Sequence, residues 1–224
     1  MARFAYEKLN AQKVAILQDR LNEYSTGLTD VFKEKFTALG GKVVSVQSYT
    51  AGETDFKPQL KAASEGAPDV IFVPGYYADA AQIVKTARTM GIRSTFIGGD
   101  GWDSDQIFGL GGDALSGSYF STHYASSADQ PKLKAFVAKY RQRFGVIPDG
   151  KAALGYDAAL VLVNAIKRAT SSEPAAIRNS LAATKDFDGV TGKITLNGER
   201  NAEKPAVILK IENGKAVFVR TAFP

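Results

Sequence analysis

Two apolar segments of this sequence are each followed at once by side chains that could bind a small polar molecule. The segments are Val70–Val73 and Thr95–Ile97, and the side chains that follow them are Tyr76, Tyr77, Asp100 and Trp102. A carboxylate binds a cationic group through short, charge-assisted hydrogen bonds, and a tyrosine offers an apolar ring with a polar tip. In an open α/β sheet, small ligands bind just outside the carboxyl ends of the strands. We therefore expect these side chains to form one wall of a pocket.

A regular alternation of strands and helices is predicted to hold these side chains in place. Short apolar runs predict strands at Val14–Leu17, Lys42–Tyr49, Val70–Val73 and Thr95–Ile97. Between them, residues with helical spacing predict helices over 24–39, 56–65 and 77–90. This order of elements is typical of an α/β fold with a parallel sheet and right-handed crossovers.

The second part of the chain has a different pattern. It predicts a strand at Ser118–Thr122, then helices at Lys132–Phe144, Ala152–Ala169 and Pro174–Ala182, and then strands at Gly192–Leu196, Ala206–Ile211 and Ala216–Arg220. Asn213-Gly214, between the last two strands, is a strong hairpin-turn signal. The apolar side of the helix from Ala153 to Ile166 is unusually large for a helix exposed to water.

Composition excludes several classes of protein. The 224 residues include 45% hydrophobic and 23% charged residues, which is ordinary for a globular protein with a real core. The absence of cysteine excludes disulfides and thiolate metal sites, and a single histidine excludes zinc sites built from several histidines. No apolar run reaches the roughly 18 residues that a membrane-spanning helix needs, and no apolar segment follows the charge near Met1 as in an export signal.

No motif for catalysis, for a cofactor or for nucleic acid stands out. His123 has neither a nucleophile elbow nor a second histidine to share a metal, so a contact at a hinge is the preferred interpretation and no enzyme is expected. The glycine-rich segment 109–112 is a poor match to a dinucleotide loop, and no cofactor is expected. The net charge of +5 is spread along the chain. The basic side of the helix at Lys132–Phe144 is interpreted as a solvated surface.

Several motifs together resemble one family. They are Tyr49-Thr50-Ala51-Gly52-Glu53-Thr54-Asp55-Phe56, Pro68-Asp69-Val70-Ile71-Phe72, Gly75-Tyr76-Tyr77, Gly98-Gly99-Asp100-Gly101-Trp102-Asp103-Ser104, Ala153-Leu154-Gly155-Tyr156-Asp157-Ala158-Ala159 and Phe187-Asp188-Gly189-Val190-Thr191-Gly192. No single motif is decisive, but in their order and spacing they resemble the periplasmic branched-chain amino acid binding proteins. These are the type I solute-binding subunits of ABC importers.

The resemblance implies a fold and a division of the chain. The expected fold is a parallel-sheet, three-layer α/β sandwich that forms one lobe of a type I periplasmic binding protein, with part of the second lobe. Residues 1–123 and 206–224 resemble the second lobe of the family, and residues 124–205 resemble the return segment into the first lobe. The opening segment of the first lobe would precede Met1, so the resemblance implies a truncated form with impaired binding. The implied location of the parent protein is the periplasm.

The resemblance also implies roles for single residues. Asp100 would bind the α-ammonium group of an amino acid, and Tyr24 and Tyr76 would line the pocket. Tyr77 and Trp102 are weaker candidates for its wall. The alternative for Asp100 is an ordinary turn aspartate, and for the aromatic residues it is packing.

The expected function is to bind a small amino acid of the branched-chain type and deliver it to an ABC permease. If the chain is stable, something must cover the apolar face of Ala153–Ile166, so a homodimer or swapped assembly through that face is expected. The alternative is a self-standing half-binding-protein or flavodoxin-like fold without ligand function, assembling as a homodimer.

Overall fold

Five strands of the first half of the chain and two from its C-terminal part assemble into a mainly parallel sheet in the computed structural model, which describes residues 1–223. The sheet has seven strands in the order β10-β9-β5-β4-β3-β1-β2. Their bounds are β1 Lys13–Asp19, β2 Lys42–Tyr49, β3 Val70–Val73, β4 Thr95–Gly98, β5 Tyr119–Thr122, β9 Ala206–Glu212 and β10 Lys215–Ala222. The pairs β1–β2, β1–β3, β3–β4 and β4–β5 are parallel. The predicted α/β class is confirmed.

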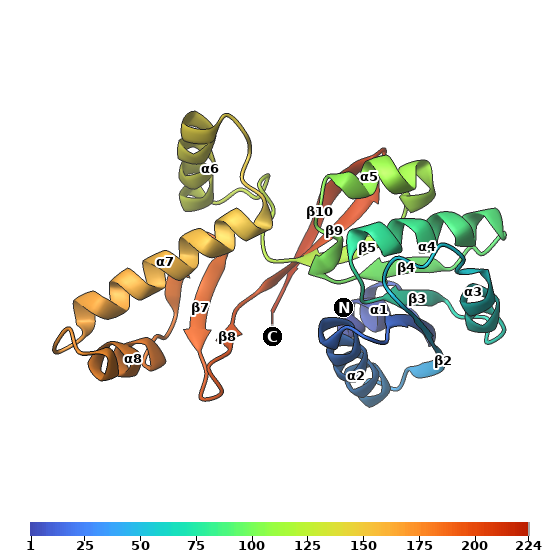
Figure 1. Cartoon of the computed structure of the whole chain (residues 1–224), viewed down its shortest axis with the longest axis horizontal. Helices are drawn as coiled ribbons and strands as arrows, with labels where there is room; N and C mark the ends of the chain where they lie inside the picture. Colours follow the sequence, from blue (N-terminus) through green and yellow to red (C-terminus); the bar gives the residue numbers. More distant parts are fainter. Residues whose placement is uncertain (224) are drawn as a thin grey trace. The chain divides into compact units, whose positions relative to one another are not determined.

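Helices cover both faces of this sheet and make the predicted three layers (Figure 1). On one face lie α1 Ala2–Lys8 and α2 Glu23–Ala38, and on the other lie α3 Lys57–Ser64, α4 Tyr77–Thr89 and α5 Gln106–Gly111. Two short 3-10 helices, η1 Asp100–Trp102 and η2 Gly112–Leu115, flank α5. Asn22 caps α2 by accepting a hydrogen bond from the backbone N–H of Tyr24.

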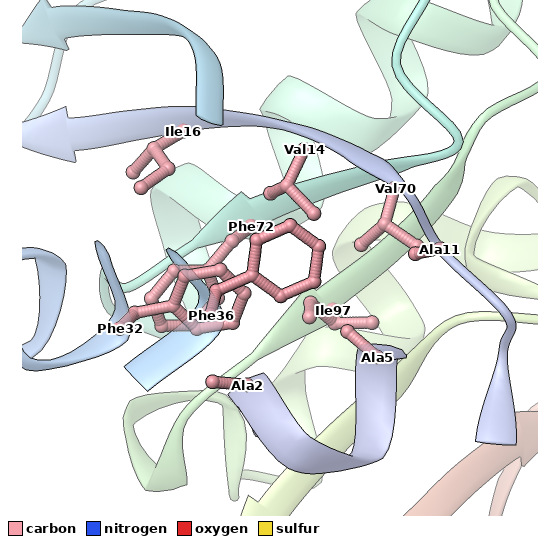
Figure 2. Packing of buried hydrophobic residues seen from close by; sticks show 10 residues of the cluster. All are labelled: Ala2, Ala5, Ala11, Val14, Ile16, Phe32, Phe36, Val70, Phe72 and Ile97. Atoms are coloured by element: carbon pink, nitrogen blue, oxygen red, sulfur yellow. The ribbon is translucent and has the colours of Figure 1, made fainter. Parts of the chain in front are cut away.

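Successive side chains of each strand point to opposite faces of the sheet, so the core of this unit lies on both faces. Every residue of β3 is buried, because helices cover both faces of a parallel strand at the centre of a sheet. Phe72 faces α2, where its ring stacks on that of Phe32 with centroids 4.3 Å apart. Figure 2 shows this cluster, with Phe36 beside Phe32 and with Ala2 of α1 close by.

The middle of the chain forms a smaller unit. It contains α6 Pro131–Phe144, α7 Gly150–Arg168 and α8 Pro174–Ala182, together with the antiparallel strands β6 Phe187–Gly189, β7 Gly192–Leu196 and β8 Ala202–Glu203. Its buried apolar cluster comprises Tyr124, Leu133, Phe136, Ala153 and Val190.

Contacts divide the chain into two units, and the second unit includes some residues that the sequence analysis grouped with 1–123. Unit 1 comprises Met1–Ser121 and Leu209–Val217, and unit 2 comprises Thr122–Ile208 and the residues from Phe218 onward. The assignment of 1–123 with 206–224, and of 124–205, to two lobes of a larger protein stays a prediction.

Among the described residues, no helix is both long and apolar enough to cross a membrane.

Besides the two 3-10 helices, the helix α5 and the strands β6 and β8 were not predicted from the sequence. Within the glycine-rich segment 109–112, Gly109 and Gly111 lie in the last turn of α5. This segment therefore ends a helix instead of opening one, which agrees with its poor match to a dinucleotide loop.

Candidate functional site

The two segments with candidate binding residues lie side by side at one edge of the sheet of unit 1. Strands β3 and β4 are parallel neighbours, and Val73 pairs with Gly98 at their ends. The loop after β3 carries Tyr76 and the loop after β4 carries Asp100. The register of the sheet thus brings together two candidates that are 24 positions apart in the sequence.

Tyr24 reaches the same place from the first turn of α2. Its hydroxyl donates a hydrogen bond to Asp100 Oδ1 at 2.8 Å, and its oxygen accepts one from the Gly101 N–H at 2.8 Å. Burial, and secondly the charge of Asp100, raise the pKa of the Tyr24 phenol above its ordinary value of 10.0. The phenol therefore stays protonated throughout the neutral range and remains a donor to the carboxylate.

The rings of Tyr24 and Tyr76 form a stack beside this carboxylate. Their centroids are 5.3 Å apart and their planes differ by 22°. Tyr76 stands at the N-cap of α4 and is 48% exposed, whereas Tyr24 is only partly exposed. An exposed aromatic face next to an exposed carboxylate suits a ligand that has both an apolar part and a cationic group.

The two weaker candidates take different positions. The Tyr77 hydroxyl donates to Gln106 Oε1 at 2.9 Å, which ties α4 to α5 at the surface. Trp102 is completely buried, and its indole N–H donates to the Val73 carbonyl at 3.0 Å. Trp102 is therefore a packing residue, as in the alternative interpretation of the sequence. Its hydrogen bond holds the end of β3 in place.

Two glycines that the sequence did not single out as site residues bring the two loops into direct contact. A Cβ atom on Gly101 would lie 2.6 Å from the Gly75 carbonyl oxygen, which is closer than real Cβ contacts allow. A side chain at Gly75 would overlap the Tyr49 hydroxyl. Only glycine fits at both positions, because the neighbouring atoms leave no room for a Cβ atom. In the sequence, the only indication of this was that the two glycines stand directly beside the candidate residues, in Gly-Tyr-Tyr and Gly-Asp-Gly.

An acidic environment surrounds Tyr49, a residue that sequence reasoning placed only in a strand. Its hydroxyl is buried and has no hydrogen-bond partner among the described residues. Burial and the carboxylates of Asp79, Asp19 and Glu53 raise its pKa. Burial also raises the pKa of Asp79, whose Oδ1 accepts a hydrogen bond from the Gly52 N–H at 3.0 Å. Nevertheless, no group of acidic residues or histidine within 1–223 could hold a metal ion.

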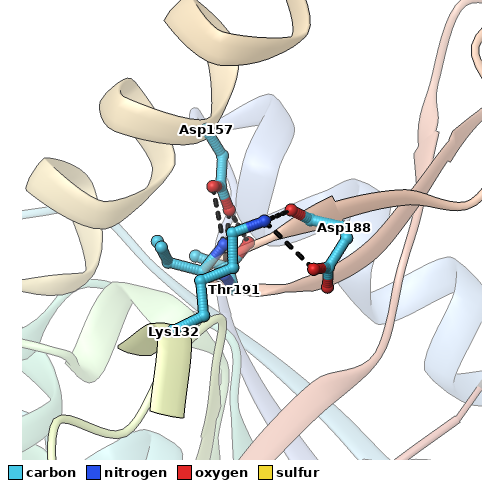
Figure 3. Close-up of polar contacts among 5 residues, drawn as sticks. Lys132, Asp157, Asp188 and Thr191 are labelled. Atoms are coloured by element: carbon cyan, nitrogen blue, oxygen red, sulfur yellow. Dashed lines mark hydrogen bonds and ion pairs between the residues drawn. The ribbon is translucent and has the colours of Figure 1, made fainter. Parts of the chain in front are cut away.

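Unit 2 contains a buried carboxylate of a different kind. Asp157 of α7 is 1% exposed and accepts hydrogen bonds from the Val190 N–H at 2.7 Å, the Thr191 N–H at 2.9 Å and the Thr191 hydroxyl at 2.7 Å. Figure 3 shows how these bonds fasten the turn between β6 and β7 to α7. Two of the family-like motifs, around Asp157 and Thr191, are therefore direct partners.

Two further contacts surround this turn. Lys132 Nζ, at the start of α6, lies 3.1 Å from a carboxylate oxygen of Asp188 and also donates to the Asp188 carbonyl (Figure 3). Lys204 donates to the His123 carbonyl at 3.3 Å, and burial lowers its pKa. His123 thus takes part in structural contacts within unit 2, through its main chain.

Comparisons with known proteins agree on one family. The family model described as "Periplasmic binding protein" matches residues 1–216. The chain is 24% identical over 213 residues to Leu/Ile/Val-binding protein homolog 1 of Brucella suis biovar 1 (strain 1330), covering 95% of this chain and 57% of that protein.

Solved structures agree as well. Leucine binding protein LivK from Thermotoga maritima MSB8 is 38% identical with a TM-score of 0.92, and the match covers 100% of this chain and 64% of that one. The substrate-binding protein LivJ from Streptococcus pneumoniae str. Canada MDR_19A, solved with isoleucine, is 34% identical with a TM-score of 0.86, covering 100% and 63%. The chain thus spans about three fifths of the length of the relatives that it matches. With 216 of its residues matched by one family model, the chain belongs to the periplasmic binding protein family.

Proposed function

We propose that this chain is a solute-binding module for a small amino acid of the branched-chain type, and that the whole protein delivers this solute to an ABC permease in the periplasm. The observation that carries the proposal is the cluster of Asp100, Tyr24 and Tyr76 at the carboxyl ends of β3 and β4. Two similar proteins support the solute class, since one is named a leucine binding protein and the other was solved in complex with isoleucine.

Each residue of the cluster has a part to play in the proposal. The exposed carboxylate of Asp100 pairs with the α-ammonium group of the amino acid, because a charge-assisted hydrogen bond is about twice as strong as a neutral one. The exposed ring of Tyr76 covers apolar atoms of the solute. Tyr77 lies at the rim of the cluster, and Trp102 acts from the core by supporting the loop that carries Tyr76. No reaction is proposed, since the cluster contains no nucleophile–base pair.

The experiment is thermal unfolding of the chain with and without millimolar leucine, isoleucine or valine. A solute at 100 times its dissociation constant adds about 2.7 kcal/mol to the free energy of unfolding. Asp100→Ala removes the carboxylate, and Asp30→Ala, on the exposed side of α2, is the matched control. We expect a shift that Asp30→Ala keeps and Asp100→Ala loses.

Two results would contradict the proposal. A shift retained in Asp100→Ala would remove Asp100 from the site. No shift with any of the three amino acids would favour the alternative of a self-standing fold without ligand function. A weak shift, seen only at high concentration, would still support the proposal if Asp100→Ala abolishes it.

We further propose that a second copy of the chain covers the outer face of α7. Four large apolar side chains of this face are between 42% and 48% exposed: Tyr156, Leu162, Val163 and Ile166. The predicted apolar stretch from Ala153 to Ile166 thus has two sides, because Ala153, Val161 and Ala165 are buried within unit 2. The small residues Gly155, Ala158 and Ala159 would allow two such helices to approach closely around a twofold axis.

Light scattering after size exclusion at micromolar concentration tests this dimer. Ile166→Glu places a charge within the proposed contact and should shift the mass from dimer toward monomer. Arg178→Glu, on an exposed position of α8, is the control for surface charge and should leave the mass unchanged. A wild-type chain that is monomeric under these conditions would refute the dimer.

A further inference from the structure

We propose that Tyr24 is the positioning residue for Asp100, and that its hydroxyl orients and polarises the carboxylate instead of contacting the solute. This inference rests on the proposed function, since it takes Asp100 as the group that binds a cation. It differs from the role that the family resemblance implies, in which Tyr24 lines the pocket.

The hydrogen bonds of the Tyr24 hydroxyl are the first argument. A phenol has a single proton to donate. The backbone N–H of Gly101 can only donate, so at 2.8 Å it must use a lone pair of the phenol oxygen. An ionised carboxylate can only accept, so at 2.8 Å Asp100 Oδ1 must receive the phenol proton. The only proton that Tyr24 can offer is therefore already committed to Asp100.

The surroundings of the hydroxyl are the second argument. A Cβ atom on Gly99 would lie 2.8 Å from this oxygen and 3.1 Å from Leu28 Cδ1, so the space beside it is closely filled. One face of the Tyr24 ring is covered by Tyr76, which is the more exposed of the two rings. Tyr76 thus presents an aromatic surface to solvent, while Tyr24 stands behind it.

The consequence for binding is electrostatic as well as geometric. The phenol and the Gly101 N–H hold Asp100 and the Gly-Asp-Gly loop as one unit, so less side-chain freedom is lost when a cation binds. A donor to a carboxylate also favours the ionised form. Because the pKa of Tyr24 is raised, this donor is present at every pH at which an ammonium ligand is charged. The carboxylate should therefore stay ionised further into the acidic range.

The test is Tyr24→Phe, which keeps the stacked ring and deletes only the hydroxyl. Carbon NMR of the Asp100 carboxyl follows its titration in the protein without any solute. We expect the midpoint to move to higher pH by about one unit in Tyr24→Phe. Tyr76→Phe, which removes the hydroxyl of the other ring in the stack, should leave the midpoint in place, as should Tyr140→Phe in α6 of unit 2.

Leucine affinity measured by calorimetry between pH 4 and 8 is the second readout. In Tyr24→Phe we expect affinity to fall about tenfold at neutral pH, and the pH of half-maximal binding to rise together with the Asp100 midpoint. Equal loss of affinity at every pH, with the midpoint unmoved, would make Tyr24 a direct contact and overturn the inference. If the wild type does not bind leucine, the proposed function fails, and the NMR midpoint still decides the role of Tyr24.

Discussion

Unit 1 and unit 2 bury their apolar side chains in different ways. In unit 1, helices cover both faces of the sheet, and β1, β3 and β4 contain mostly buried residues. In unit 2, α7 buries one side against α8 and the short strands, while its other side exposes Leu162, Val163 and Ile166. The difference indicates that apolar surface is buried more completely in unit 1 than along α7 of unit 2.

The carboxylates of the two units show the same contrast. Asp157 is buried, and three donors from the turn between β6 and β7 satisfy it, so its charge serves the fold. Asp100 is exposed at the carboxyl end of β4 and receives a hydrogen bond from Tyr24, and in the proposed function its charge serves binding. A scaffold that is well buried can hold a charged group at its rim without distortion.

The largest expected effect is on the core of unit 1. Phe72→Ala removes a buried ring that stacks on Phe32 and should lower the free energy of unfolding by about 3–5 kcal/mol. Leu162→Ala, on the exposed side of α7, is the control and should cost less than about 1 kcal/mol in the monomer. Urea denaturation measures both. Equal losses would contradict the contrast between the two units.

The next effect concerns the hydrogen bonds by which Asp157 holds the turn between β6 and β7 in unit 2, called here the Asp157 clasp. Asp157→Ala leaves the buried N–H groups of Val190 and Thr191 without an acceptor and should cost about 2–4 kcal/mol. Hydrogen exchange should show faster exchange of these two amides, while amides in β3 keep their protection. Asp188→Ala is the matched control, because its side chain is 76% exposed and its ion pair should contribute at most about 1 kcal/mol. An unchanged exchange rate at Thr191 would show that the clasp does not hold the turn.

Alkaline pH should act on unit 1, because Tyr24 and Tyr49 of this unit have a raised pKa. A group whose pKa is raised on folding stabilises the fold below its ordinary pKa, here 10.0, and this stability is lost as pH rises toward the folded value. We therefore expect unfolding to become easier above about pH 10. Tyr49→Phe removes an unpartnered hydroxyl, so it should cost little at pH 7 and should flatten the alkaline loss. An alkaline limb as steep as that of the wild type would remove Tyr49 as its cause.

The smallest effect is expected at Asp79. Its raised pKa means that the folded state favours the protonated form, so this contribution to stability is present below the ordinary value of 3.8 and is lost as pH rises through the folded pKa. Asp79→Asn cannot ionise and still offers an oxygen to the Gly52 N–H. It should therefore be neutral or stabilising by about half a kcal/mol at pH 7, since solvent screens this half-buried group. The gain should vanish below pH 4, and thermal unfolding at the two pH values tests this.

Much of the fold could be predicted because its elements carry local signals. The strand at Val70–Val73 and the helix at Pro174–Ala182 have the predicted bounds, and Asn213 and Gly214 both have the positive φ of a tight hairpin turn. Helix α5 was missed because Gly109 and Gly111 disfavour a helix locally, and its packing against α4 and η2 decides otherwise. Strand β6 was missed because three residues show no period, and because Asp157, which holds the turn after β6, is 33 positions from Val190 in the sequence.

The candidate site was predictable only in part. The positions of Tyr76 and Asp100 after two adjacent strands followed from the pattern of elements, because parallel strands end at one edge. Tyr24 was named through the family resemblance alone, since nothing local in the sequence links it to Asp100. The contact of Gly75 with Gly101 and the buried hydroxyl of Tyr49 were not predicted, because they depend on atoms that meet only in the folded chain.

The sequence by itself determined the α/β class, the order of the elements and the edge at which polar side chains gather. These follow from hydrophobic periodicity and turn chemistry, which act between residues close in the chain. Only the tertiary structure decided that the Tyr24 hydroxyl donates its hydrogen bond to Asp100, that Trp102 lies in the core and that Asp157 holds the turn before β7. Hydrogen bonds need alignment within a few tenths of an ångström, and spacing along a sequence carries no information at that scale.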